Sequence, residues 1–137
     1  MKKILLIVIP LLLIVGCSKP INDDTLIDKD GIKYHPETKE LYSGETTKSW
    51  LDEKKGIEGS YKDGEKDGLW TIWYTNGRKW SEKTYRDGVL DGLSTNWDRK
   101  GKMDSQGIYK DGELISQKCW DEDGNECECS DWGRGCK

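Results

Sequence analysis

The chain has 137 residues, with 22 basic and 26 acidic residues and a net charge of −4. This balance argues against nucleic-acid binding, which requires clustered positive charge. Seven Trp, six Tyr and 16 Gly, with no Phe and no Ala, favour strands and tight turns over helices.

The N-terminus has the pattern of an export signal. Two lysines at positions 2 and 3 precede an unbroken apolar run over residues 4–15. A membrane-spanning helix needs about 20 apolar residues, whereas a signal-peptide core needs only about 7–15. The run ends at Gly16-Cys17, which resembles a bacterial lipobox. The resemblance implies cleavage before Cys17 and acylation of its thiol; the alternatives are a simple membrane anchor, or an ordinary signal peptide followed by a chance Cys.

This interpretation sets the expected domain organisation. Residues 1–16 are the signal peptide, and residues 17–30 form the lipidated Cys and a flexible tether, since residues 18–24 lack apolar periodicity. Residues 31–129 form the sheet domain, and residues 130–137 form a Cys-containing tail. Loss of the two leader lysines leaves 20 basic and 26 acidic residues. The resulting net charge of −6 argues against electrostatic adhesion to anionic lipid. Attachment to the membrane would therefore depend on the lipid at Cys17, and we expect a lipid-anchored envelope protein that faces outside the cytoplasm.

An internal repeat with a constant interval runs through the chain. The pattern Tyr-x-Asp-Gly begins at Tyr61, Tyr85 and Tyr109, so successive copies are equally spaced. Each interval contains two pairs of the type Asn-Gly, Asp-Gly or Lys-Gly. Asn-Gly and Asp-Gly are strong hairpin signals because their turns need positive φ. These pairs lie at 63–64, 76–77, 87–88, 100–101, 111–112 and 123–124. The repeat therefore predicts an all-β fold: an elongated antiparallel meander of stacked β-hairpins.

The repeat also carries a family resemblance. Residues 61–77 read Tyr-x-Asp-Gly-x-x-x-Gly-Leu-Trp-x-x-Trp-Tyr-x-Asn-Gly, which resembles the MORN-repeat variant of the YwqK-type antitoxin family. Segments 30–34 and 41–44 resemble the family's lead-in, so the resemblance covers about residues 28–126. It implies an elongated single-layer sheet, and a toxin as the partner. The third copy departs from the pattern, with Ser116 where the others have Gly68 and Gly92.

Four cysteines lie near the C-terminus, and their even number outside the cytoplasm predicts two disulfides. The alternative, a zinc site, lacks the usual paired C-x2-C spacing. A bridge between residues two apart would strain a very short loop, which leaves two connectivities. We favour Cys119–Cys127 with Cys129–Cys136 over the remaining arrangement.

No constellation of residues predicts catalysis, a metal or a cofactor, so we do not expect an enzyme. The single histidine, His35, precedes a proline in a loop and has no identifiable partner. Residues 121–126 superficially resemble a calcium loop, but the Gly required at its sixth position is absent. A hairpin turn explains this segment better.

Comparison of the repeats suggests a binding surface. Alternate residues of a strand share a face. One face recurs between copies, and we interpret it as the structural face: Leu69, Thr71 and Trp73, then Leu93, Thr95 and Trp97. The opposite face does not recur: Trp70, Ile72 and Tyr74 become Ser94, Asn96 and Asp98.

The non-recurring aromatic set predicts an exposed patch of Trp70, Ile72 and Tyr74, extended by Trp80 or Trp50. The alternative is a thicker core beneath the lead-in segment. The expected function is that of a lipid-anchored, protein-binding repeat module, immunity-like if the family resemblance extends to function. The alternative is a structural envelope spacer or adaptor without a discrete ligand.

Overall fold

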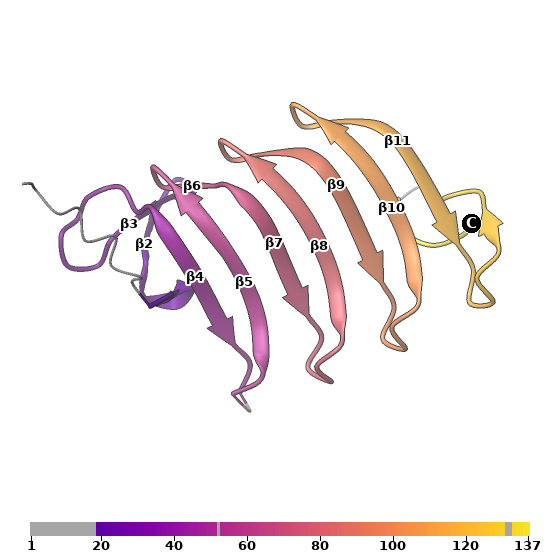
Figure 1. The fold of residues 1–137 in the computed structure, drawn as a ribbon, viewed down its shortest axis with the longest axis horizontal. Coiled ribbons are helices and arrows are strands. Elements are labelled where there is room, and N and C mark those ends of the chain that lie inside the picture. The colour runs from indigo at the N-terminus through magenta and orange to yellow at the C-terminus, as the bar shows by residue number, and fades with distance from the viewer. Residues whose placement is uncertain (1–18, 52, 131–132) are drawn as a thin grey trace, which may run out of the picture.

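The computed structural model describes residues 19–51, 53–130 and 133–137, which form one long, twisted sheet and a small two-stranded sheet (Figure 1). From β4 onward, neighbouring strands of the long sheet are antiparallel and follow one another in sequence, apart from the short β6. The predicted all-β meander is therefore confirmed. Its strands are β4 Gly44–Ser49, β5 Lys55–Lys62, β6 Glu65–Lys66, β7 Gly68–Trp73, β8 Lys79–Arg86, β9 Val89–Trp97, β10 Met103–Lys110, β11 Glu113–Trp120 and β12 Glu126–Cys127.

All six predicted turns lie between paired strands. At one end of the strands Asp63, Asp87 and Asp111 have φ of 51°, 46° and 49°, and each is followed by a Gly with φ between 80° and 86°. Positive φ at both central residues is the type I′ geometry that matches the twist of a hairpin. The Asp-Gly pairs are therefore required by the backbone conformation.

Neighbouring hairpins are joined by backbone hydrogen bonds that recur at the repeat interval. The turn glycines donate to carbonyl oxygens that are themselves one repeat apart, so each hairpin docks on the preceding one in the same way. The pairs are Gly64 to Tyr42 (2.8 Å), Gly88 to Lys66 (2.9 Å) and Gly112 to Leu90 (2.8 Å).

The lead-in segment is part of the fold. Its elements are β1 Ile21–Asn22, the 3-10 turn η1 Asp23–Thr25, β2 Ile27–Lys29 and β3 Ile32–Tyr34. β1 extends the sheet by pairing in parallel with β4, and β2 pairs with β3. The prediction of a tether over residues 17–30 is thus wrong for residues 21–29. Their apolar residues have no regular period, yet Leu26 is buried in the core. Cys17 lies outside the described residues.

The two faces of the long sheet differ. We call the face that carries Ile57, Ile72 and Ser81 the inner face; these residues are register partners across β5, β7 and β8. The lead-in segment covers the inner face at one end, and the tail after β12 covers it at the other. We call the opposite face, which carries Glu58, the outer face.

The hydrophobic core lies between the lead-in segment and the inner face. Rings of Tyr42, Tyr61, Trp70 and Tyr85 form a chain of edge-on contacts, with centroid separations of 6.1, 5.0 and 6.4 Å. Leu26 completes the buried cluster. The Tyr61 hydroxyl donates to the Asp23 carboxylate at 3.0 Å, which anchors η1 to the sheet.

Candidate functional site

The structure does not support the predicted aromatic patch at its central residue. Trp70 is only 4% exposed, and its indole N–H donates to the Ser60 carbonyl at 3.1 Å. Ile72 lies beside it on the inner face and is half-buried. The alternative prediction, a thicker core beneath the lead-in segment, describes these residues correctly.

The outlying members of that patch tie neighbouring hairpins together. The Tyr74 hydroxyl donates to the Trp97 carbonyl at 2.9 Å, and the Trp50 indole donates to the Trp73 carbonyl at 3.0 Å. Trp80 is 37% exposed and stacks on Tyr74, with ring centroids 5.8 Å apart. Of the predicted patch, Trp80 is therefore the member that reaches the surface most fully.

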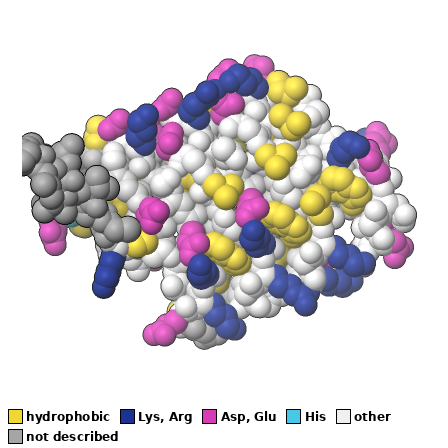
Figure 2. All heavy atoms as spheres, in the orientation of Figure 1, with side chains coloured by type: hydrophobic (Ala, Val, Ile, Leu, Met, Phe, Trp, Pro, Cys, Tyr) yellow, Lys and Arg dark blue, Asp and Glu magenta, His cyan; other side chains and the backbone are white. Residues whose placement is uncertain are grey.

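The exposed apolar surface lies instead on the outer face, which the repeats had suggested was the structural one. Leu69 and Leu93 are 56% and 48% exposed, and Ile108, the register partner of Leu93, is 51% exposed. The recurring Trp73 and Trp97 are half-buried on the same face. In Figure 2, hydrophobic side chains form a broken band across the strands, with charged side chains around it. The recurrence of Leu at the repeat interval was the sequence signal for this surface.

Charges on the outer face are neutralised locally. The Lys55 ammonium pairs with Glu58 at 2.7 Å and lies 5.6 Å from the centroid of Trp73. The arrangement recurs in the next copy, where Lys79 pairs with Glu82 and lies over Trp97. In the copy after that, the corresponding residues are Met103 and Gln106. This pair is therefore absent from the third copy, where Lys118, the register partner of Gln106, pairs with Glu126 at 3.0 Å instead.

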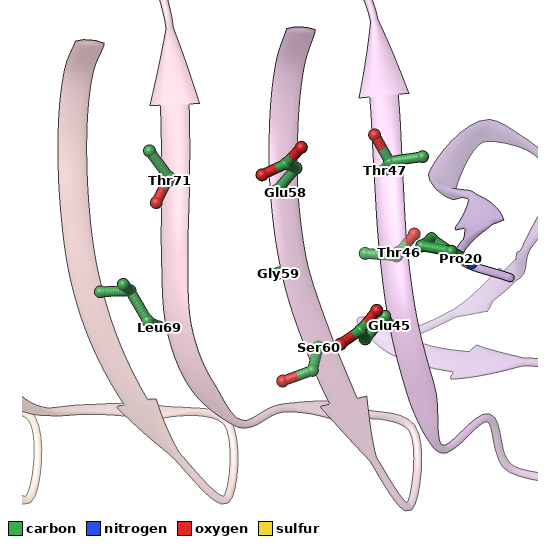
Figure 3. Close-up of a pocket in the computed structure, with 9 residues that line it drawn as sticks. All are labelled: Pro20, Glu45, Thr46, Thr47, Glu58, Gly59, Ser60, Leu69 and Thr71. Carbon is green, nitrogen blue, oxygen red and sulfur yellow. The ribbon is translucent and has the colours of Figure 1, made fainter. Parts of the chain in front are cut away.

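A shallow hollow of about 490 Å³ lies at the other end of the outer face, between β4, β5 and β7 (Figure 3). Two carboxylates, Glu45 and Glu58, line it together with threonine and serine hydroxyls, and Leu69 forms part of its wall. Glu58 has Lys55 as a partner, whereas Glu45 makes no ion pair with any residue that the structure describes. The hollow is thus suited to a basic side chain.

The inner face retains two lysines between its covering segments. The Lys66 ammonium lies 4.5 Å from the centroid of Trp70 and 5.1 Å from that of Tyr85. Burial lowers the pKa of Lys66, and the nearby charge of Lys83 acts in the same direction, against the raising effect of Asp23. Lys83 itself lies on β8, beside Trp70 in the strand register.

The four C-terminal cysteines form two disulfides, but with the pairing that we did not favour. Cys119 bonds Cys129 and Cys127 bonds Cys136, with Cα–Cα distances of 5.2 and 5.7 Å. Cys119 and Cys127 are register partners, as expected for a hairpin. The preferred pairing is wrong because the tail turns back across the inner face. This brings Cys129 to Cys119, which is completely buried.

Other motifs have structural explanations. The Nδ1 atom of His35 accepts the backbone N–H groups of Glu37 and Thr38, at 3.2 and 3.3 Å, and so holds a turn. The Asp121 carboxylate accepts the N–H groups of Asp123 and Asn125, which is a turn contact. Within the described part of the chain there is no cluster of three or more His, Cys, Asp or Glu residues able to hold a metal ion. No helix in that part is long and apolar enough to cross a membrane.

Comparison with protein families, curated proteins and solved structures finds no match for this chain.

Proposed function

We propose that this protein is a lipid-anchored envelope protein that binds another protein through the outer face of its sheet. The observation that carries the proposal is the row of exposed Leu69, Leu93 and Ile108 on a face that neither the lead-in segment nor the tail covers. Large apolar side chains gathered on one exposed face are typical of an interaction site. The lipobox-like Gly16-Cys17 pattern and the two disulfides support a location outside the cytoplasm.

The chemistry of the outer face indicates what kind of partner it suits. Each lysine–glutamate pair of the outer face is neutral overall. A partner surface that is apolar and largely uncharged would therefore match the Leu and Trp side chains of this face. The hollow beside Glu45 would accept one basic side chain from the partner. We infer a polypeptide partner with an apolar contact surface flanked by Lys or Arg.

The position of the anchor also bears on this function. Ile21, the first residue of β1, follows Cys17 by four positions, a reach of about 14 Å at full extension. A lipid on Cys17 would therefore hold the β1–β4 edge of the sheet near the bilayer. Because the strands succeed one another along the long axis in Figure 1, the sheet would extend away from the anchor, with Leu93 and Ile108 farther from it than Leu69. If the resemblance to antitoxins extends to function, the partner is a toxin that acts at the envelope.

Site-specific photocrosslinking in cells tests the proposal. A photoreactive residue at Leu93 should give a discrete adduct, whereas one at Val89, equally exposed but on a turn-proximal strand end, should not.

The purified partner should bind the full chain, and Leu69→Glu with Leu93→Glu should weaken binding at least tenfold without changing the melting temperature. Glu45→Lys should weaken it less. Unchanged binding by the double variant would overturn the proposal and favour the spacer function.

A separate variant tests the anchor. Cys17→Ser should abolish acylation and release the protein from the membrane fraction or block its processing. Membrane fractionation unchanged by this substitution would contradict the lipoprotein assignment without affecting the assignment of the outer face.

A further inference from the structure

The inner face changes character between adjacent repeats. In the first copy Gly59 lies beneath the indole of Trp70. The equivalent residues of the next copy are Lys83 and Ser94, which are register partners on β8 and β9. The tryptophan that covers a glycine in the first copy is thus replaced by a serine beside a lysine in the next copy. The short serine side chain leaves open the space that the indole fills in the first copy.

A hollow of about 410 Å³ occupies this region, between β8–β11 and the C-terminal tail. Its polar lining comes from both the sheet and the tail, and none of the described residues that line it is an Asp or a Glu. The groups that matter for the argument are Lys83, Ser94, Asn96, Tyr109, Gln117 and Arg134. The volume falls within the range of small-molecule sites, about 300–1,000 Å³.

Three of these six side chains are held in place by the protein. The Asn96 amide donates to the Ser105 hydroxyl at 3.0 Å. The Gln117 amide donates to the Gly133 carbonyl, which fixes the tail against β11. Arg134 pairs with Asp104 at 3.0 Å and lies over the Trp80 ring at 5.7 Å. Together with the Cys119–Cys129 bond, these contacts build a preformed wall.

The other three side chains retain unused donors. Neither the Lys83 ammonium nor the Ser94 and Tyr109 hydroxyls have a hydrogen-bond or ion-pair partner among the described residues. Ser94 is only 5% exposed, so its opening to solvent is through the hollow. A partly buried cation without a counter-charge is costly, and an anion that accepts from it relieves that cost.

We propose that this hollow is a binding site for a small ligand bearing an oxyanion, either a carboxylate or a phosphate. Its oxygens accept from the Lys83 ammonium and from the hydroxyls of Ser94 and Tyr109. The uncharged remainder of the ligand lies against the tail and Gln117. The site is on the face opposite to the proposed protein-binding surface and does not depend on it.

Isothermal titration calorimetry and backbone NMR on the full mature chain in detergent micelles test the site. Inorganic phosphate and glucuronate are the two oxyanion probes, and glucose is the uncharged control. We expect one or both anions, but not glucose, to bind and to shift the amide resonances of Lys83, Ser94 and Gln117. The stronger of the two anions identifies the ligand class. No saturable binding of either anion would overturn the proposal.

Substitutions then assign the contacts. Lys83→Met should weaken binding at least tenfold and Tyr109→Phe a few-fold, whereas Lys62→Met, an exposed lysine on the outer face, should have no effect. Outer-face variants such as Leu93→Glu should bind the anion normally, which separates this site from the proposed function. Anion binding retained in Lys83→Met would exclude the hollow as the site.

The repeat itself supplies a second, independent variant. Lys83→Gly with Ser94→Trp transfers the Gly59–Trp70 pair into the next copy. If the hollow is the site, the transplanted indole fills it, and anion binding disappears while the melting temperature is kept or raised. A folded double variant that still binds the anion would contradict the proposal. If the double variant does not fold, Lys83→Met and Tyr109→Phe decide the question.

Discussion

The indole of Trp70 lies against the backbone of Gly59 on the neighbouring strand, so closely that a Cβ atom at position 59 would be 2.3 Å from the ring. No side chain fits between them. The contact holds the largest core side chain directly against the inner face of the sheet, beneath the lead-in segment. It also explains why a glycine stands in the middle of β5, where glycine otherwise weakens a strand.

The first prediction concerns this contact. Gly59→Ala should lower the free energy of unfolding by about 1–3 kcal/mol, because Trp70 must move to admit the methyl group. Denaturant unfolding measures the loss. Gly107→Ala is the matched control: it also lies in a strand, and its nearest contacts, 3.1 Å away, are the side-chain ends of Leu114 and Tyr109. Equal losses for the two variants would show that the Trp70 contact is not the cause.

The second prediction distinguishes the buried tryptophan from the exposed one. Trp70→Ala should cost about 3–5 kcal/mol, the range for removal of a large aromatic side chain from a core. Trp80→Ala should cost less than half as much, because Trp80 is 37% exposed and contacts mainly Tyr74 and Arg134. Thermal unfolding followed by near-UV circular dichroism measures both. A larger effect at Trp80 would mean that the core is centred elsewhere.

The hairpins could be predicted from the sequence because their determinants are local. Each Asp-Gly pair specifies a turn through its own backbone conformation, as the positive φ of Asp63, Asp87 and Asp111 shows. The constant repeat interval then stacks equivalent hairpins through equivalent hydrogen bonds. The turns are therefore local, whereas the stacking bonds, such as that from Gly64 to Tyr42, join residues about one repeat apart and could be anticipated only because the interval is constant.

The functional surfaces were harder to predict because the covering segments do not repeat. Alternation shows which residues share a face, as it did for Leu69 and Trp73, but not which face is covered. That depends on the lead-in segment and the tail, whose sequences have no period. Their placement buries Trp70 and leaves Leu69 exposed, the reverse of the prediction. The disulfide pairing failed for the same reason, since the return of the tail over the inner face is not encoded in the hairpin register.

The third prediction is the disulfide connectivity. Glu128 separates Cys127 from Cys129, so combined Glu-specific and tryptic cleavage without reduction resolves the pairing. The peptide with Cys127 should be linked to the one with Cys136, and the peptide with Cys119 to the one with Cys129. Reduction should lower the free energy of unfolding by about 2–3 kcal/mol for each bond, as expected for loops of this length. A link between Cys119 and Cys127 would contradict the structure.

The fourth prediction concerns pH and two equivalent turns. The Asp98 carboxylate accepts the N–H groups of Lys102 and Lys100, both at 2.8 Å, and Asp121 accepts those of Asn125 and Asp123. Backbone hydrogen bonds, chiefly those from Lys102 and Asn125 respectively, hold the pKa of each carboxyl below its ordinary value of about 3.9. Carboxyl carbon NMR titration should place both pKa values below that value.

Because the folded state favours the ionised carboxylates, the unfolded chain binds more protons at acidic pH. The stabilisation from Asp98 and Asp121 is therefore present above the unfolded pKa, near 3.9, and is lost as the pH falls through the lower, folded pKa. Asp98→Ala and Asp121→Ala should each destabilise the protein at pH 7 and do so progressively less below pH 4. Asn76→Ala is the matched control, since the uncharged Asn76 side chain accepts from Arg78 at 3.0 Å in the corresponding turn. Its destabilisation should not change between pH 7 and pH 3, and a parallel decline would show that the turns weaken in acid for a reason other than protonation of these two carboxylates.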